Sequence, residues 1–315
     1  MKNYSKFHYH ISEWKTQVDA VLQSVNSRKY RQKHIRQGEV RDSINKKNIE
    51  LLLEWINAHE SSRFYRNLEI FKSANAKIIN REKLYSSEMW VMSELSEIST
   101  IIDYSSDFNT NDFNSILTEA LNGAQHIDEE KIDGNNVARN KIFELNVASK
   151  LKKFDFNVTL GNTKESGSID IHTSYDNRDF FIECKRLQVI ASLNGNVKKA
   201  ISQLEKKNIK RENSIIALDF TKIFWQEHLN NGNIIPDGEI NAREILENAQ
   251  NLYGDILKEK YSKYFNDILL FLCHINIPFN NTLTGPRHIR HFFLIHNNDT
   301  KDINLQTFIN QIKKT

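Results

Sequence analysis

The chain has 315 residues, 39% apolar and 26% charged, which is enough for about two folded domains and rules out disorder as its main state. Only 10 Gly and 3 Pro leave little material for collagen-like, linker-rich or turn-dense all-β architectures, and a mean hydropathy of -0.58 indicates a soluble protein. The net charge of +3 is only mildly basic, so charge alone does not establish a nucleic-acid partner.

The first part of the chain, up to about residue 125, has the periodicity of amphipathic helices. Two apolar stripes show this spacing: Trp14, Val18, Val21 and Leu22, then Ile49, Leu52, Leu53 and Ile56. The acidic, glycine-containing stretch 128–136 is the expected boundary of the helical part. We therefore expect a helical N-terminal region at 1–127 and a second domain at 128–315.

The second half alternates helices with short strand-like runs, which is the pattern of an α/β domain. In chain order we expect a helix at 137–154, strands at 156–160, 168–175 and 180–187, a basic helix at 197–208, a strand at 215–220, a long helix at 242–264, strands at 268–277 and 289–296, and a closing helix. A turn at 176–178 joins the second strand to the third, which makes these two strands a hairpin.

The expected location is the cytoplasm. The longest uninterrupted apolar stretch of the second half, Ile268 to Cys273, is far shorter than the roughly 20 residues of a membrane span. The first residues, MKNYSKFHYHISEWK, lack the apolar core of a signal peptide. Cys184 and Cys273 lie in apolar runs, as buried thiols of a reducing compartment do. We expect no membrane partner.

One carboxylate is placed unusually for a helix. Glu144 lies in the middle of an apolar stripe of the helix at 137–154, formed with Val147, Ala148 and Leu151. Burying an unpaired carboxylate costs several kcal/mol, so we expect a cation beside it. Two explanations stay open: a structural ion pair with an Arg or Lys of the sheet, and a role in a site.

The hairpin carries the second unusual pattern. Alternation places Asp170 and His172 on one face of the first strand. In the partner strand, Glu183 and Lys185 share a face, opposite Phe180, Ile182, Cys184 and Arg186. Each charge alone is ordinary in a half-exposed strand. A helical Glu followed by a strand Asp and a strand Glu-x-Lys is a less ordinary combination.

These residue types suit the hydrolysis of a phosphodiester bond. That reaction needs an activated water and positive charge beside the oxygens that gain negative charge, and oxygen ligands holding one or two Mg²⁺ ions supply most of both. A Lys two positions from such a ligand, on the same face of a strand, can orient the attacking water and offset charge in the transition state.

Three segments resemble the core of the PD-(D/E)XK nuclease superfamily, which has the restriction-endonuclease-like fold. The segments are RNKIFELNVASKL at 139–151, GSIDIHTSYDNRDFFIECKRL at 167–187 and VKKAISQLEKK at 197–207. The resemblance covers about 135–225 clearly. It implies an α/β domain with a mixed central sheet flanked by helices, preceded here by the mainly helical N-terminal region.

The resemblance also implies roles for individual residues. Asp170 and Glu183 would be metal ligands, Lys185 the catalytic lysine, and Glu144 the acidic residue of the core helix, which binds the metal or a water next to it. Further implied site residues are Gln203, the helix glutamine of many members, and Cys184, through its backbone carbonyl. The implied cofactor is Mg²⁺, with Mn²⁺ as a substitute.

Two positions depart from the family pattern. Ile169 precedes Asp170 where the family name has Pro, and Lys207 stands where some members have a Tyr four residues after the glutamine. The second departure makes the role of Gln203 less certain than that of the ligands.

The expected function is that of a metal-dependent nuclease, and in particular a DNA endonuclease that acts in defence against phage or mobile DNA. DNA is the expected partner, with RNA as an alternative, and a homo-oligomer is expected because cutting both strands with one site per chain usually needs two copies. The helical region would bind nucleic acid, sense a trigger or mediate oligomerisation. The alternatives are a catalytically silent nucleic-acid-binding or regulatory module that keeps the fold, and a scaffold protein whose helical half is the functional part.

Basic residues form two clusters that are candidates for phosphate contacts. The first lies at 28–47 and includes Arg31 and Lys33, and the second includes Lys198, Lys199, Lys206 and Lys207. Solvated helix faces explain each cluster equally well. The histidines favour structural or DNA-facing roles over a zinc site, because no cysteine pair or HExxH spacing accompanies them: His8, His10, His274, His288, His291 and His296.

Overall fold

The computed structural model describes residues 63–297, apart from 81, 83, 105–107, 109, 125–126, 131–135, 162–167, 176, 231–235, 237 and 282–284. Several predictions lie outside the described residues. They are the two apolar stripes at 14–22 and 49–56, the basic cluster with Arg31 and Lys33, His8 and His10, and the closing helix.

The described part of the N-terminal region is helical, as its periodicity predicts. Its helices are α3 (Arg63–Arg66), α4 (Leu68–Asn80), α5 (Ser86–Asp103) and α6 (Thr110–Leu121), followed by the 3₁₀ turn η2 (Ile127–Glu129). Helix α5 begins where Glu88 accepts a hydrogen bond of 2.8 Å from the backbone N–H of Tyr85. Glu88 also accepts from Lys77 of α4 at 2.9 Å, which joins the two helices at their ends.

Six strands form a mixed sheet whose spatial order is the order of the chain. They are β1 (Asn157–Leu160), β2 (Ile171–Tyr175), β3 (Arg178–Arg186), β4 (Ser214–Asp219), β5 (Leu270–Asn281) and β6 (Gly285–His296). Pairing is antiparallel from β1 to β3, parallel from β3 to β5, and antiparallel between β5 and β6. The predicted α/β class with a mixed sheet flanked by helices is therefore confirmed.

The parallel pairs require crossovers, and helices supply them. Between β3 and β4 the chain forms η3 (Ile190–Ser192), α8 (Leu193–Lys206) and η4 (Arg211–Asn213). Between β4 and β5 it forms α9 (Thr221–Phe224), a π-helical segment η5 (Trp225–Asn230), α10 (Glu239–Tyr261) and η6 (Ser262–Asn266). The sequence patterns predict α8 and α10 but miss α9 and η5, which are too short for a helical period to appear.

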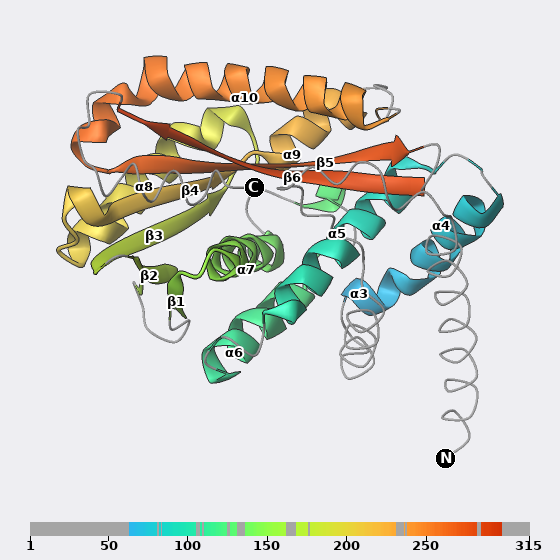
Figure 1. The fold of residues 1–315 in the computed structure, drawn as a ribbon, viewed down its shortest axis with the longest axis horizontal. Helices are drawn as coiled ribbons and strands as arrows, with labels where there is room; N and C mark the ends of the chain where they lie inside the picture. Colours follow the sequence, from blue (N-terminus) through green and yellow to red (C-terminus); the bar gives the residue numbers. More distant parts are fainter. Residues whose placement is uncertain are drawn as a thin grey trace.

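Helices cover both faces of the sheet (Figure 1). Helices α5, α6 and α7 (Val137–Lys153) lie on one face, and α8 and α10 contribute to the apolar cluster of the other. The central strand β4 shows this two-sided burial directly, because Ala217 belongs to the first cluster and its neighbours Ile216 and Leu218 to the second.

The helices of the N-terminal region bury apolar surface directly against the α/β part. Ile98 of α5 and Leu117 of α6 belong to the same buried cluster as Phe143 of α7 and Ile171 of β2. The boundary at 128 stays a prediction. None of the helices within the described ranges has the length and apolar content needed to cross a membrane.

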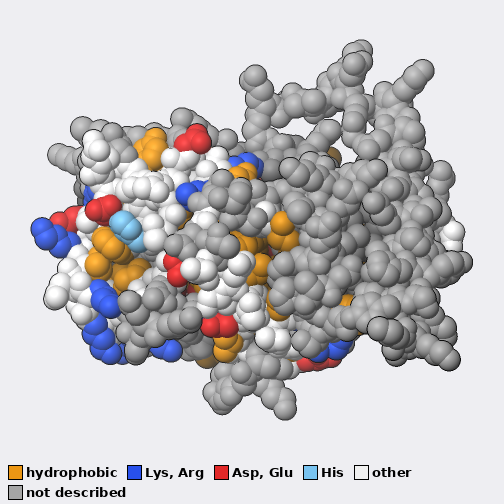
Figure 2. Space-filling model, turned by 90° about the horizontal axis from the view of Figure 1, so that it is seen from below, with side chains coloured by type: hydrophobic (Ala, Val, Ile, Leu, Met, Phe, Trp, Pro, Cys, Tyr) orange, Lys and Arg blue, Asp and Glu red, His pale blue; other side chains and the backbone are white. Residues whose placement is uncertain are grey.

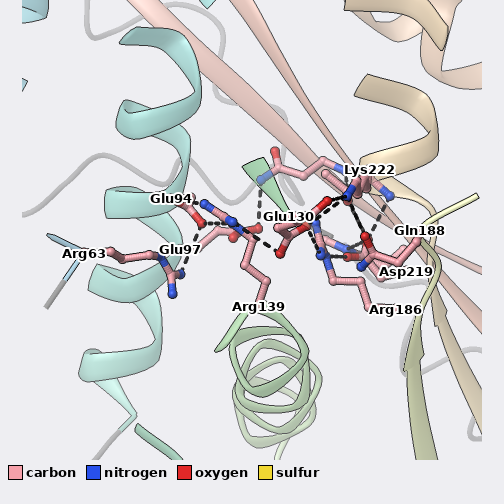
Figure 3. A network of polar contacts seen from close by, with 12 residues as sticks. Arg63, Glu94, Glu97, Glu130, Arg139, Arg186, Gln188, Asp219 and Lys222 are labelled. Carbon is pink, nitrogen blue, oxygen red and sulfur yellow. Dashed lines mark hydrogen bonds and ion pairs between the residues drawn. The ribbon is translucent and has the colours of Figure 1, made fainter. Parts of the chain in front are cut away.

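A network of buried charges lies between α5, α7 and the sheet (Figure 3). Its centre is Glu130, whose carboxylate meets Arg186 of β3 at 2.6 Å, Arg139 of α7 at 3.2 Å and Lys222 of α9 at 3.6 Å. A single buried anion therefore neutralises cations from three elements.

Two further anions extend the network on either side of Glu130. Glu94 of α5 binds Arg139 at 2.7 Å and Arg63 of α3 at 3.2 Å. Asp219, the last residue of β4, binds Arg186 at 3.2 Å and lies 3.0 Å from Nδ1 of His274. Burial of unpaired charges is costly, so these contacts fix the helices of one face on the sheet.

We predict that Glu130→Gln lowers the free energy of unfolding by about 3–5 kcal/mol, because it leaves buried cations without their anion. The matched control is Glu239→Gln, which breaks the 45% and 42% exposed pair of Arg243 and Glu239 on α10. It should cost about 0.5 kcal/mol or less. Urea denaturation of both variants measures the difference, and equal costs would contradict the role of the network.

Candidate functional site

The candidate site lies next to the first residue of β2, where β3 continues without β2 as its neighbour. The two strands pair as far as Ile171 opposite Ile182, and β3 then runs on to Arg186 with β4 on its other side. Extending the register by one residue brings Asp170 opposite Glu183. Within the described residues, β3 beyond Ile182 thus has a strand edge that β2 does not cover.

At this edge, the side chain of Asp170 supplies a hydrogen-bond acceptor in place of the strand backbone. Its Oδ2 atom accepts a hydrogen bond of 2.8 Å from the backbone N–H of Cys184. A partly buried N–H left unpaired would be costly, so the carboxylate replaces the carbonyl that a longer β2 would supply. This contact explains why β2 begins at Ile171 and not at Ser168, as the alternation alone predicts.

Glu183 and Lys185 lie together on the same side of β3, in agreement with the alternation. The Nζ atom of Lys185 donates to Glu183 Oε2 at 2.8 Å and to the backbone carbonyl of Cys184 at 3.2 Å. It lies 3.7 Å from Asp170 Oδ2, which is longer than a hydrogen bond. The ammonium group therefore stands among two carboxylates and one carbonyl at the open strand edge.

Glu144 is buried on α7 and its cation comes from the same helix. The Nζ atom of Lys141 lies 2.9 Å from Oε1 and 2.8 Å from Oε2 of Glu144. The expected cation beside Glu144 is therefore present, but it comes from α7 and not from the sheet, as the ion-pair explanation had it. Lys141 was not identified from the sequence, although its spacing of three residues from Glu144 is a known signal for a helical ion pair.

Burial and the crowding of charges change the pKa values of the site residues. Burial raises the pKa of Glu144 to about 8, the Asp170 charge adds to this effect, and Lys141 and Lys185 oppose it. Burial likewise raises the pKa of Glu183 to about 7, with Asp170 adding and Lys185 opposing. The pKa of Lys185 is raised, since Asp170 and Glu183 outweigh the opposing effect of burial. The carboxyl groups of Glu144 and Glu183 therefore gain or lose a proton near neutral pH.

Cys184 takes part through its backbone only. Burial raises the pKa of its thiol, and the charges of Asp170 and Glu144 add to the shift, so the thiol stays protonated. Its N–H holds Asp170, and its carbonyl accepts from Lys185. The proposed metal role of this carbonyl therefore competes with the hydrogen bond from Lys185.

The donor chemistry of the site fits a divalent cation. The charge of Asp170, which directly precedes β2, acts on both Glu144 of α7 and Glu183 of β3, and a hard cation would relieve this repulsion. Glu183 Oε1 is buried and has no hydrogen-bond partner within the described part of the chain, so it is an available oxygen ligand. Among the described residues, however, no three His, Cys, Asp or Glu side chains are arranged to hold a metal ion. In this structure Lys141 contacts both oxygens of Glu144, and Lys185 contacts Glu183.

The other predicted site residues lie on α8. Gln203 is half-buried, and its Oε1 atom is buried and accepts no hydrogen bond from the described residues, Lys185 included. The basic residues of this helix are exposed: Lys198, Lys199, Lys206 and Lys207.

The histidines of the last two strands make contacts within the protein. His274 pairs with Asp219 in the buried network. His291 lies 2.7 Å from Gln250 of α10, and His296 lies 3.1 Å from the carbonyl of Asn297. His172, on the Asp170 face of the hairpin, stacks on Phe181. These contacts support structural roles.

Sequence reasoning missed the buried network as well as Lys141. The signal was present in Arg186, which shares its strand face with apolar residues and therefore had to be buried. Its partner Glu130 lies within the stretch 128–136 that the composition marks as a boundary, so it was not considered for the core.

Gly161 fixes the backbone at Asp170. Its N–H donates to the carbonyl of Asp170 at 2.8 Å. A Cβ atom at this position would lie 2.1 Å from the carbonyl oxygen of Ile169 and 3.2 Å from that of Asp170. The end of β1 therefore passes this segment so closely that only glycine fits.

Comparison with known proteins gives no relative. No protein-family model matches the chain, and neither the curated proteins nor the solved structures contain a significant match. The functional conclusion therefore depends on the residues and geometry of this chain.

We predict that Gly161→Ala lowers the free energy of unfolding by about 1–3 kcal/mol, because backbone atoms at Ile169 must move. Gly195→Ala on α8 is the matched control, since a Cβ there meets nothing within 4 Å. It should be neutral or stabilising by up to about 1 kcal/mol. Chemical denaturation compares the two, and a neutral Gly161→Ala would disprove the close approach.

A second prediction concerns pH. Because the pKa values of Glu144 and Glu183 are raised to about 8 and about 7, the folded protein keeps protons that the unfolded chain has lost. Their contribution to stability is present in mild acid and falls as the pH rises from about 5 to 8. Glu144→Gln should make this slope less negative. Urea unfolding across the range tests this, and an unchanged slope would count against the raised pKa.

Proposed function

We propose that this chain is a metal-dependent nuclease of restriction-endonuclease-like fold, which hydrolyses phosphodiester bonds as an endonuclease acting on DNA. The observation that carries the proposal is that Lys185 contacts Glu183 and approaches Asp170 where β3 extends beyond β2, while Glu144 is near enough for the charge of Asp170 to help raise its pKa. The helix α7, the hairpin β2–β3 and the following helix α8 stand in the order that the resemblance implies.

The proposed metal ligands are the three carboxylates and the carbonyl of Cys184. Mg²⁺, or Mn²⁺ in its place, would supply Lewis acidity toward the phosphate and lower the pKa of a water molecule. Asp170 is held in position for this task by the N–H of Cys184, and Glu183 offers its unpartnered Oε1 atom.

Lys185 is proposed to orient the attacking water and to contact the phosphate. Its ammonium group has three N–H bonds, of which two are used in hydrogen bonds to Glu183 and to the carbonyl of Cys184. At 3.7 Å, Asp170 is too distant to take the third. That N–H can donate to a phosphate oxygen and offset charge that develops there.

A carboxylate of the site is proposed to receive the proton of the water. As the water oxygen forms its bond to phosphorus, the bond from phosphorus to the leaving oxygen breaks and the water loses a proton. Glu144 is the proposed acceptor, through a carboxylate oxygen that is not bound to the ion, and the leaving oxygen can then take up this proton.

Contacts with the DNA backbone are proposed for the exposed lysines of α8, which directly follows the site strand. Figure 2 shows the molecule from the side on which α7 lies. On this face, Lys and Arg lie mainly along one margin of the described surface, with acidic and apolar side chains between them. This mixture is in keeping with the small net charge of +3. A role in defence against phage or mobile DNA, in a homo-oligomer, belongs to the same proposal.

The proposal predicts that cleavage depends on Lys185 and Glu183. Purified protein should nick supercoiled plasmid with Mg²⁺ and not with a chelator, and Lys185→Ala or Glu183→Gln should lower the rate by about 100-fold or more. Lys258→Ala, at an exposed lysine of α10, should cleave like the wild type.

Cleavage that persists in Lys185→Ala would exclude the assignment. Linear DNA and RNA substrates in parallel assays identify the nucleic acid. Absence of cleavage on all of them, combined with salt-dependent binding of DNA, would favour a silent binding module instead.

A further inference from the structure

A second ammonium group, that of Lys141, is part of the site and has no role in the mechanism above. It lies 2.9 Å and 2.8 Å from the two carboxylate oxygens of Glu144. The side chain of Glu144 is 7% exposed and that of Lys141 is 18% exposed, so the pair lies just below the surface. Both oxygens that Glu144 would offer to a metal ion are therefore engaged by one lysine.

The acidic groups around Lys141 outnumber the ammonium groups. The negative groups that act on it are Glu144, Asp170 and Glu119. Glu144 in turn is acted on by Asp170, Lys141 and Lys185. When fully ionised, the carboxylates of Glu144, Asp170 and Glu183 face two ammonium groups, those of Lys141 and Lys185. A divalent cation brings the same charge as these two lysines together.

We propose that Lys141 is the internal counter-ion of Glu144, and that a divalent cation binds this site by displacing the Lys141 ammonium group from the carboxylate. The inference rests on the proposed function, because it takes Glu144 as a metal ligand. The Lys141 ammonium group lies between the two oxygens of Glu144, where an ion bound by both oxygens would lie, and it repels a divalent ion at this distance. The displaced group, on its partly exposed side chain, becomes available to a substrate phosphate.

The first test measures binding of Mg²⁺ and Mn²⁺ to the full chain by titration calorimetry. Lys141→Gln should bind the ions about fivefold or more tightly than the wild type, because the competing positive charge is gone. Lys141→Arg keeps the charge and should stay within about twofold of the wild type. Lys258→Gln on α10 is the control for removing an exposed lysine and should behave like the wild type.

The second test uses the wild-type protein, so it does not depend on the folding of a Lys141 variant. Brief treatment with an acetylating reagent, followed by mass spectrometry of peptides, reports how readily each lysine reacts. Adding Mg²⁺ should increase acetylation of Lys141 about threefold or more, while Lys258 stays constant. In Glu144→Gln, where the pair is weakened, Lys141 should react readily without the ion.

The outcomes separate this inference from the proposed function. Equal or weaker ion binding by Lys141→Gln, or acetylation of Lys141 that Mg²⁺ does not change, overturns the counter-ion role and leaves the nuclease proposal standing. If the wild type binds the ions and Glu183→Gln does not, the metal site of the proposed function is supported independently. Failure of both wild type and Lys141→Gln to bind either ion overturns both.

Discussion

The candidate site depends on one constraint, the late start of β2. Because β2 begins only at Ile171 while β3 runs to Arg186, β2 does not pair with the last residues of β3, and the side chain of Asp170 accepts the hydrogen bond of the Cys184 N–H. That single hydrogen bond places a carboxylate beside Glu183 and Lys185. Because residue 161 is a glycine, the end of β1 can approach the backbone of the same segment closely. An interrupted strand pairing thus brings like charges together in a partly buried place.

Neighbouring cations and a rigid frame of buried ion pairs offset the free-energy cost of placing these carboxylates close together. Lys141 forms an ion pair with Glu144, and Lys185 forms one with Glu183. The frame is the buried network, in which Arg139 lies five positions before Glu144 on α7, and Arg186 directly follows Lys185 on β3. Glu130 joins these two arginines. The same carboxylate therefore holds the helix that carries Glu144 at a fixed distance from the strand that carries the Glu-x-Lys pair.

The sequence predicts the parts of this arrangement that have a periodic signal. Alternation places Glu183 with Lys185 on one face of their strand, and helical spacing identifies Glu144 as a buried anion. The register that brings Asp170 opposite Glu183 depends on the turn, and β3 begins at Arg178, within the turn expected at 176–178. Lys141 is harder to predict, since charged pairs three residues apart are common on exposed helices. Glu130 has no such signal, because its partners Arg139, Arg186 and Lys222 are distant in the chain and only the tertiary fold brings them together.

The link between α5 and β5 has a consequence for the order of assembly. Asn276 of β5 donates to Ser93 at 2.9 Å and to Glu97 at 2.8 Å, across 183 and 179 residues of chain. While the polypeptide emerges from the ribosome, this helix is therefore complete long before its hydrogen-bonding partner exists. The hairpin and its acidic residues are synthesised in the interval, so the strands of the candidate site are complete before β5 can join the sheet to α5.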